Sequence, residues 1–300
     1  MVSNVPFSVT VHPYDSPTRG ACAYEYEPGT HAASTINRNA VIFIGGLGDG
    51  PHTVPYVRAV ARYLETAGKK LAYSVFEIRL RSSFVGFGTS SLKNDVEDIA
   101  ALVRYLRGLG KEKIVLFGHS TGCQDCIEYA DHVKHNNPPV DGFIMQGPIS
   151  DRESMDTVFP SYRDSLDLAN EWIAQGRAHD CLPRDKAPQD LGAPITAYRF
   201  KSLVAKDGDD DYFSSDLDDE TVRKYWGRFN KPVLALHSAN DEYVPGFVDQ
   251  AKENLRFQKA NPMVSPLSGL IPEASHQVLE ETAREWLNQR VMEFLQTLEK

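Results

Sequence analysis

The sequence has few of the features that mark secreted, membrane-spanning or nucleic-acid-binding proteins. Its first residues contain no basic region followed by an apolar stretch, so we expect no signal peptide. No apolar run approaches the ~20 residues that a transmembrane helix needs. Acidic residues outnumber basic ones, with 41 aspartates and glutamates against 32 lysines and arginines, and the net charge of -9 disfavours binding to the phosphates of nucleic acids. These absences leave a cytoplasmic protein as our expectation.

Cysteine is rare too, with four among 300 residues, and the spacing of the four does not indicate a disulfide framework. Cys123 and Cys126 form a C-x-x-C pair, but no second cysteine pair accompanies them. A metal or redox site is therefore disfavoured, and we interpret both residues as small core residues of a helix. We expect no cofactor and no metal site formed by the protein itself.

Strand and helix patterns alternate along most of the chain, and this alternation predicts the fold class. Nearly continuous apolar runs, typical of strands covered on both faces, are separated by segments with apolar residues at helical spacing. The expected strands are 7–12, 21–27, 40–44, 72–80, 113–117, 141–146, 232–237 and 263–271. The first two favour an antiparallel edge. Repeated strand–helix units predict an α/β fold with a doubly wound, mostly parallel sheet.

The pattern changes in the middle of the chain. Residues 151–230 are polar, acidic and poor in strand signal, and they include the strongly acidic stretch 206–220. Strand–helix alternation resumes at residue 232. We therefore predict a core domain formed by residues 1–150 and 231–300, with residues 151–230 inserted as a cap. Such a cap would lie over the carboxyl ends of the strands, where folds of this class bind their ligands.

One short motif carries most of the chemical information. Residues 118–122 read Gly-His-Ser-Thr-Gly, directly after an apolar strand and before a segment with helical spacing. A serine at such a strand–turn–helix junction is typical of the nucleophile elbow of α/β-hydrolases. The flanking glycines let the strand and the helix approach each other closely. The pattern alone would occur by chance in roughly a tenth of chains of this length. The prediction therefore depends on the strand and helix around it.

A serine hydroxyl needs a base to accept its proton and a third group to orient that base. In this architecture the chain order is serine, then an acid, then histidine. We predict Ser120 as the nucleophile, Asp241 as the orienting carboxylate and His276 as the general base and then acid. Asp241 follows a late strand, and His276 lies in a loop before the last helix. The other acids that remain open for the orienting role are Asp151, Glu153 and Glu242.

The oxyanion of a tetrahedral intermediate needs two backbone N–H donors. One is expected from Thr121, directly after the nucleophile. The other is expected from the glycine-rich loop 45–50, where we favour Leu47 and expect Gly46 to let the backbone approach the substrate. The spacing of this loop matches neither a dinucleotide-binding nor a Walker motif. His119, inside the elbow, is expected to point away from the pocket.

Several longer strings resemble one family. They are 45–50 (Gly-Gly-Leu-Gly-Asp-Gly), 88–92, 118–125 (Gly-His-Ser-Thr-Gly-Cys-Gln-Asp), 146–153, 211–217 and 241–245. Together they resemble a group of mostly fungal α/β-hydrolases that includes the SidJ-type siderophore esterases, which cleave fusarinine C. The resemblance covers nearly the whole chain. It implies an α/β-hydrolase fold, ester hydrolysis and a triad of Ser120, Asp241 and His276.

The resemblance also implies a siderophore substrate. Fusarinine C is a cyclic tri-ester whose free amines are protonated near neutral pH, and the acids of residues 207–220 could attract them. On this interpretation Asp211, Tyr212 and Phe213 bind substrate, while a solvated acidic loop is the alternative. Iron would arrive with the substrate, and ester cleavage would weaken its chelation. Other functions left open are hydrolysis of another ester or thioester, acyl transfer, and ligand binding without catalysis.

Overall fold

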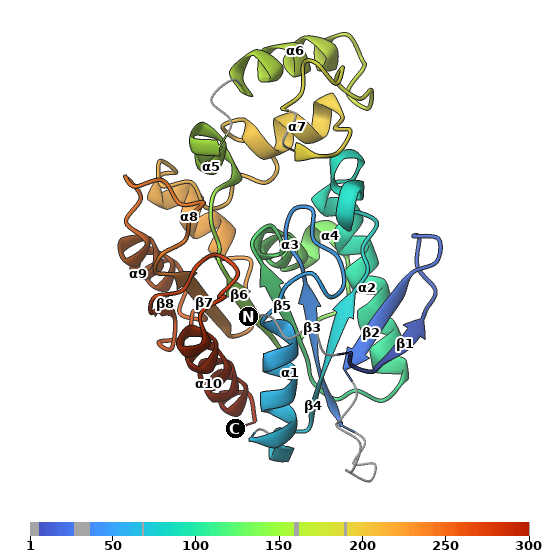
Figure 1. The fold of residues 1–300 in the computed structure, drawn as a ribbon, viewed down its shortest axis with the longest axis vertical. Helices are drawn as coiled ribbons and strands as arrows, with labels where there is room; N and C mark the ends of the chain where they lie inside the picture. Colours follow the sequence, from blue (N-terminus) through green and yellow to red (C-terminus); the bar gives the residue numbers. More distant parts are fainter. Residues whose placement is uncertain (1–5, 27–36, 68, 159–161, 189–190, 300) are drawn as a thin grey trace.

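A computed structural model describes residues 6–26, 37–67, 69–158, 162–188 and 191–299. Its strands are β1 (Val9–Pro13), β2 (Cys22–Tyr26), β3 (Asn39–Ile44), β4 (Tyr73–Ile78), β5 (Ile114–His119), β6 (Gly142–Gln146), β7 (Val233–Ser238) and β8 (Gly269–Ile271). They form one sheet in the order β1-β2-β4-β3-β5-β6-β7-β8 (Figure 1). β2 pairs antiparallel with both β1 and β4, whereas the pairs from β4 to β8 are parallel. The predicted antiparallel edge and parallel sheet are confirmed.

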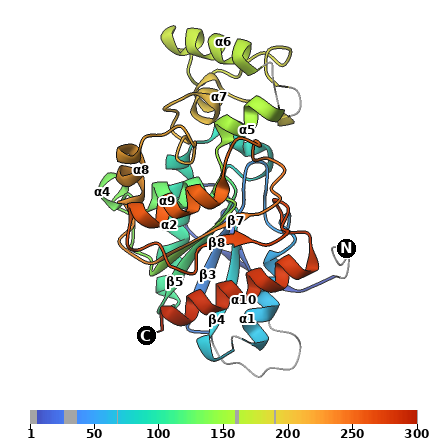
Figure 2. The same ribbon diagram turned by 90° about the vertical axis from the view of Figure 1, so that its left-hand side faces the viewer.

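Helices cover both faces of this sheet. The helices of the described residues are α1 (Val57–Thr66), η1 (Lys69–Leu71), η2 (Phe84–Thr89), α2 (Leu92–Gly108), α3 (Gly122–Tyr129), α4 (His132–His135), α5 (Asp151–Val158), α6 (Tyr162–Ala174), α7 (Ala197–Val204), α8 (Asp219–Trp226), α9 (Gln250–Ala260) and α10 (Glu281–Thr297). α1 and α10 pack on one face, and α2, α3, α8 and α9 pack on the other (Figure 2).

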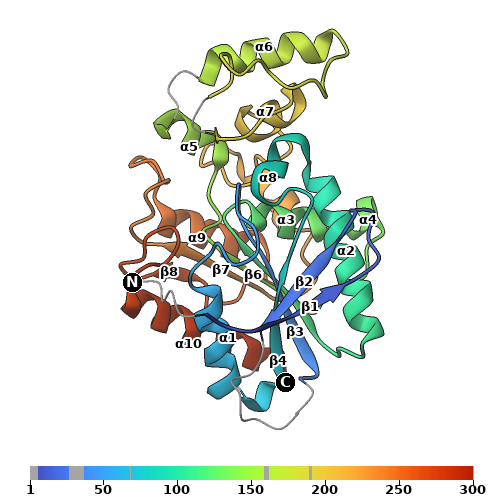
Figure 3. The same ribbon diagram turned by 45° about the vertical axis from the view of Figure 1, so that its right-hand side comes forward.

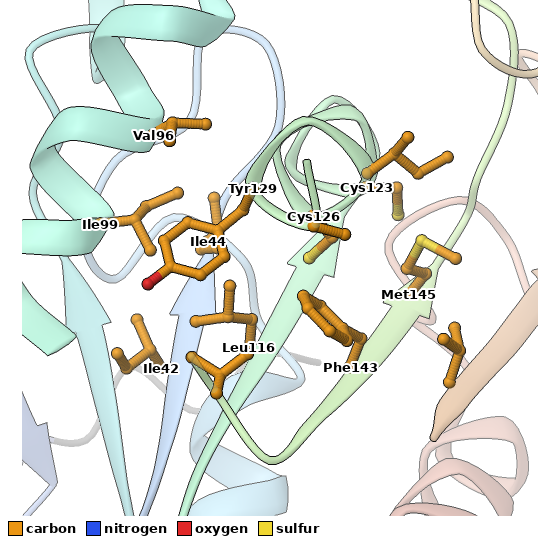
Figure 4. Packing of buried hydrophobic residues seen from close by; sticks show 14 of the residues in the cluster. Ile42, Ile44, Val96, Ile99, Leu116, Cys123, Cys126, Tyr129, Phe143 and Met145 are labelled. Atoms are coloured by element: carbon orange, nitrogen blue, oxygen red, sulfur yellow. The ribbon is translucent and has the colours of Figure 1, made fainter. Parts of the chain in front are cut away.

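The continuous apolar runs of the central strands follow from this double coverage. In β3, Ile42 and Ile44 belong to the core on the α2–α3 side, whereas Val41 and Phe43 belong to the core on the α1–α10 side. Figure 4 shows the α2–α3 side, where strand side chains face those of the two helices. Cys123 and Cys126 lie in this core as free thiols, and burial raises the pKa of each. Their interpretation as core residues is confirmed.

Residues 151–230 divide into two parts by their packing. The segments from α5 to α7 form a separate hydrophobic cluster, which meets the core at Phe87. Both Figure 1 and Figure 3 place α5, α6 and α7 together at one end of the molecule. By contrast, side chains from Tyr212 to Phe229, including Trp226, pack into the core of the sheet. This packing favours a cap narrower than the predicted 151–230, ending near Ala205.

The last strand and the last helix are shorter than the sequence predicts. Of the expected strand 263–271, only Gly269–Ile271 pairs with β7, and Val264 forms an isolated bridge to Val233. Residues 265–268 instead form a turn closed by the hydrogen bond from Ser268 N–H to the Ser265 carbonyl. The apolar stripe of the sequence predicts a last helix over 278–298, but α10 begins at Glu281, so Leu279 precedes it and is half-exposed. No helix in the described part of the chain has both the length and the apolarity to cross a membrane.

Candidate active site

Ser120 lies at the turn between β5 and α3 in a strained backbone conformation. Its φ angle is 52°, in the left-handed region that residues with a side chain rarely adopt. The turn is held by neighbouring segments, because Ser120 N–H donates to the Gln146 carbonyl of β6 at 3.0 Å. The Ser120 carbonyl in turn accepts from Cys123 N–H in α3 at 2.8 Å. This geometry is that of the predicted elbow.

The glycines around the elbow are required by close backbone contacts. A Cβ atom on Gly118 would overlap the carbonyl of Gly122, and one on Gly122 would overlap the carbonyl of Ile44. Strand and helix therefore approach each other as the motif predicts. A Cβ atom on Gly46 would lie 2.6 Å from the Cβ of Ser120. The small size of Gly46 thus gives the oxyanion loop room beside the serine side chain.

His276 and Asp241 are hydrogen-bonded to each other. Nδ1 of His276 lies 2.7 Å from Oδ2 of Asp241, whose side chain is completely buried. The other carboxylate oxygen accepts from Tyr243 N–H at 3.1 Å. Because a carboxylate only accepts, Nδ1 carries the proton and Nε2 of a neutral ring is left as an acceptor. This is the tautomer that a general base for a serine needs.

The three other acids make different contacts. Glu242 accepts from the backbone N–H of His276 at 2.8 Å and so fixes the loop that carries the ring. Glu153 accepts from the N–H and the hydroxyl of Ser215. Asp151 accepts from a glutamine side chain of α3. In the described residues none of the three contacts the His276 ring by a hydrogen bond, so the geometry favours Asp241.

Ser120 and His276 line one cavity of about 390 Å³. A cavity of this size can hold a small-molecule substrate. The glycine-rich loop lines it with Leu47, Gly48 and Asp49, and α5 of the cap contributes Asp151, Ser154 and Met155. Across the described ranges, no group of three or more histidine, cysteine, aspartate or glutamate side chains is arranged to hold a metal ion. Because the glycine-rich loop and α5 both line it, the cavity lies between the sheet core and the segment that begins with α5.

The backbone amides proposed for the oxyanion remain available. Within the described residues, neither Leu47 N–H nor Thr121 N–H donates a hydrogen bond to another protein group. Leu47 also lines the cavity. Gly46 N–H, in contrast, donates to Oδ2 of Asp49 at 2.9 Å. The contact of Asp49 with Gly46 closes the loop and leaves the amide of the next residue, Leu47, without a competing acceptor.

The expectation that His119 points away from the pocket is wrong. His119 lines the cavity, and its ring centroid lies 4.9 Å from that of His276. Gln146 explains this orientation, because its Oε1 lies 2.6 Å from His119 Nδ1 and its Nε2 donates to the His276 carbonyl at 3.2 Å. Burial and the neighbouring His276 lower the pKa of His119 to about 4. His119 is therefore a neutral packing partner of His276.

Two residues that contact His276 were not predicted from the sequence. Gln146 ends β6 and joins both histidines, and its polar side chain after an apolar run was the available signal. Tyr243 lines the cavity and packs edge-on against the His276 ring, with centroids 4.9 Å apart. No local pattern in the sequence indicates the position of Tyr243. Tyr243 thus packs against the ring of His276, while Gln146 binds its backbone carbonyl.

A model of one protein family, described as "Protein of unknown function (DUF1749)", matches residues 1–296. The chain belongs to this family. Its resemblance to fungal α/β-hydrolases of the SidJ type is confirmed by named relatives and by a solved structure. The eight-stranded, mostly parallel sheet flanked by helices is an α/β-hydrolase fold.

Two curated relatives of this DUF1749 chain carry esterase names. It is 33% identical over 319 residues to Esterase AN6793 of Emericella nidulans, covering 85% of this chain and 83% of the relative. It is 29% identical over 343 residues to the fusarinine C esterase sidJ of Aspergillus fumigatus, covering 94% and 95%. Among solved structures, the siderophore hydrolase EstB from Aspergillus fumigatus matches with a TM-score of 0.82 and 28% identity over 99% of both chains.

The acidic stretch of this DUF1749 chain does not meet the expectation for substrate binding. Asp211, Tyr212 and Phe213 do not line the cavity. Asp211 pairs with Nε of Arg152 at 3.2 Å, the Tyr212 hydroxyl donates to Glu128, and Phe213 packs in the core of the sheet. The expectation is corrected because these side chains are buried by partners from other segments.

Proposed function

We propose that this DUF1749 protein hydrolyses esters through an acyl-enzyme intermediate, with Ser120, His276 and Asp241 as its triad. The protein is a carboxylic ester hydrolase of the α/β-hydrolase fold, as its relationship to named esterases supports. The observation that carries the triad is the 2.7 Å contact between His276 Nδ1 and Asp241 Oδ2. That pair lies at the cavity that the strained Ser120 also lines.

In the first half-reaction, Ser120 Oγ attacks the ester carbonyl carbon while His276 Nε2 accepts the hydroxyl proton. Asp241 stabilises the imidazolium, and the N–H groups of Leu47 and Thr121 stabilise the oxyanion. The tetrahedral intermediate then collapses, the C–O bond of the ester breaks, and the alcohol leaves with the proton from His276. The acyl group remains on Ser120 as an ester.

In the second half-reaction, water replaces the alcohol. His276 Nε2 removes a proton from this water as its oxygen attacks the acyl carbon. Collapse of the second intermediate returns the proton to Ser120 Oγ and releases the carboxylic acid. The water-derived oxygen ends in the acid, and the enzyme returns to its starting state. No cofactor enters either step.

We propose an ester of a hydroxamate siderophore, such as fusarinine C, as the substrate. Support comes from the names of two similar proteins, a fusarinine C esterase and a siderophore hydrolase. Hydrolysis of the linking esters would separate the iron-binding groups and lower their effective concentration around Fe(III). The apolar wall formed by Leu47, Phe87 and Met155 favours a second candidate, an ester with an apolar acyl chain. We also propose that the protein is cytoplasmic.

The Ser120→Ala variant tests the proposed chemistry. We expect kcat for p-nitrophenyl acetate and for fusarinine C to fall by about a thousandfold or more, because the nucleophile is lost. Product formation from fusarinine C is followed by mass spectrometry, and fluorophosphonate labelling reports the nucleophile directly. Ser8→Ala, which changes an exposed serine away from the cavity lining, is the control. Labelling or undiminished turnover in the Ser120→Ala variant would refute the assignment.

A further inference from the structure

The described wall of the catalytic cavity carries two carboxylates and two histidines but no lysine or arginine. In the described part of its wall, the carboxylates of Asp49 and Asp151 have no lysine or arginine beside them. His119 adds no positive charge near neutral pH, since burial and the neighbouring His276 hold its pKa at about 4. A positively charged substrate group would therefore be attracted into this cavity, whereas an anion would be repelled.

The two carboxylates differ in the hydrogen bonds that they accept. Asp49 accepts from Gly46 N–H through Oδ2 at 2.9 Å and from the Thr53 hydroxyl through Oδ1 at 2.8 Å. Both oxygens are thus engaged in closing the glycine-rich loop. Asp151 accepts from Nε2 of Gln124 through Oδ2 at 2.7 Å, and its Oδ1 receives no hydrogen bond from the described residues. Asp151 is therefore the carboxylate with an oxygen available to a ligand.

Among the described residues, no lysine or arginine forms an ion pair with Asp151. The guanidinium of Arg199 acts electrostatically on Asp151, but it is bound to both oxygens of Asp210 at 2.8 and 2.6 Å. Burial and the charge of Asp210 raise the pKa of Asp151 to about 7, against the opposing effects of Arg199 and His276. A ligand cation at Oδ1 would favour the ionised carboxylate and gain a charge-assisted hydrogen bond.

We infer that Asp151 binds a protonated amine of the ester substrate inside the catalytic cavity. The inference rests on the proposed function and names its substrate class, an ester whose acyl part carries an ammonium group. Asp151 is the first residue of α5, at the point where the chain passes from the core into the cap. The cap thus places a substrate-binding carboxylate in the cavity that contains Ser120.

This assignment differs from attraction by the acidic stretch. Within that stretch, Asp210 pairs with Arg199, while Asp216 pairs with both Arg152 and Lys206. These ion pairs offset part of the negative charge of the stretch, and none of its residues lines the cavity. A cation bound there would be separated from the reacting carbonyl. A cation bound by Asp151 would help to orient the ester for attack by Ser120.

Two matched esters test the inference: p-nitrophenyl ε-aminocaproate and its N-acetyl derivative, which differ in charge but share the acyl chain. At about pH 8 the amine is protonated and Asp151 is ionised. We expect the unsubstituted protein to have a higher kcat/KM for the amino ester. In Asp151→Asn the ratio of the two kcat/KM values should fall about tenfold, mainly through a higher KM for the amino ester.

Asp209→Asn is the matched control, because it removes one charge from an exposed aspartate of the acidic stretch. Its ratio should equal that of the unsubstituted protein. A test without substitution is competitive inhibition by hexylammonium, which should be stronger than inhibition by hexan-1-ol. Equal hydrolysis of both esters by the unsubstituted protein, or an unchanged ratio in Asp151→Asn, would overturn the inference alone. Absence of all hydrolysis together with absence of fluorophosphonate labelling would overturn the proposed function as well.

Discussion

The two walls of the catalytic cavity are held in different ways. The core wall carries Ser120 at the end of β5 and His276 in the loop after β8, and backbone and side-chain hydrogen bonds fix each residue. Ser120 is bound to β6 through the Gln146 carbonyl, and the Gln146 side chain also binds the His276 carbonyl. Asp241 follows β7 directly, with its side chain completely buried. The positions of the reacting groups are therefore set by the sheet itself.

The cap wall is held by a separate hydrophobic cluster and by side-chain contacts that include a buried ion pair. Arg199 of α7 is bound to Asp210 and also donates from Nε to the Phe87 carbonyl of η2 at 3.2 Å. A Cβ atom on Gly88 would overlap the carbonyl of Pro194, so cap and core backbones touch there. In the proposed mechanism, the core therefore positions the reacting groups, whereas a separately packed wall would select the substrate.

The largest expected effect lies in the core wall. Asp241→Asn should lower kcat/KM for p-nitrophenyl acetate by about 10⁴-fold, because an amide favours the wrong tautomer of His276. Steady-state kinetics measures this loss. Glu242→Gln is the matched control, since its side chain contacts only the backbone of that histidine, and the loss there should stay within about tenfold. A greater loss in Glu242→Gln than in Asp241→Asn would move the orienting role to Glu242.

The second largest effect is expected on stability, from loss of the buried ion pair between Arg199 and Asp210 that anchors the cap. Arg199→Met should lower the free energy of unfolding by about 3–5 kcal/mol, because it leaves the carboxylate of Asp210 buried without its partner. Chemical denaturation followed by circular dichroism measures the change. Arg177→Met is the control, because its pair with Asp180 is exposed and should contribute about 0–1 kcal/mol. Equal losses in both variants would show that the buried pair does not anchor the cap.

The core wall could be predicted from the sequence to a greater extent than the cap wall. Strands such as β3 and β5 are apolar along their whole length because both faces are covered, and that pattern is visible locally. The elbow is also local, because its glycines and Ser120 adjoin in the chain. His119 was misplaced because its direction depends on Gln146, which lies on the neighbouring strand.

The cap wall depends on partners that are distant in the sequence. The acidic stretch suggested an open charged surface, yet Arg152 and Arg199 form ion pairs with three of its aspartates. Tyr212 and Phe213 occur among these acids but pack in the core of the sheet. The composition of the stretch does not indicate these ion pairs or these packing contacts. For the same reason, Asp151 was considered only as a rival to Asp241, although its position in the cavity suits it to a substrate amine.

The smallest expected effect is a pH dependence confined to the cap wall. Because the pKa of Asp151 is raised to about 7, its carboxyl is mostly neutral at pH 6 and mostly ionised at pH 8. The ratio of kcat/KM for p-nitrophenyl ε-aminocaproate to that for its N-acetyl derivative should therefore rise severalfold across this range. The substrate amine, with a pKa of about 10, stays protonated throughout.

The groups that face Asp151 are Gln124 of α3, Arg199 and Asp210 near the cap anchor, and His276. In Asp151→Asn the ratio should be flat between pH 6 and 8, because the titrating carboxyl is gone. If the ratio still rose in this variant, another group would be the source of the amine preference. A flat ratio in the unsubstituted protein would contradict the binding of the substrate amine by the Asp151 carboxylate.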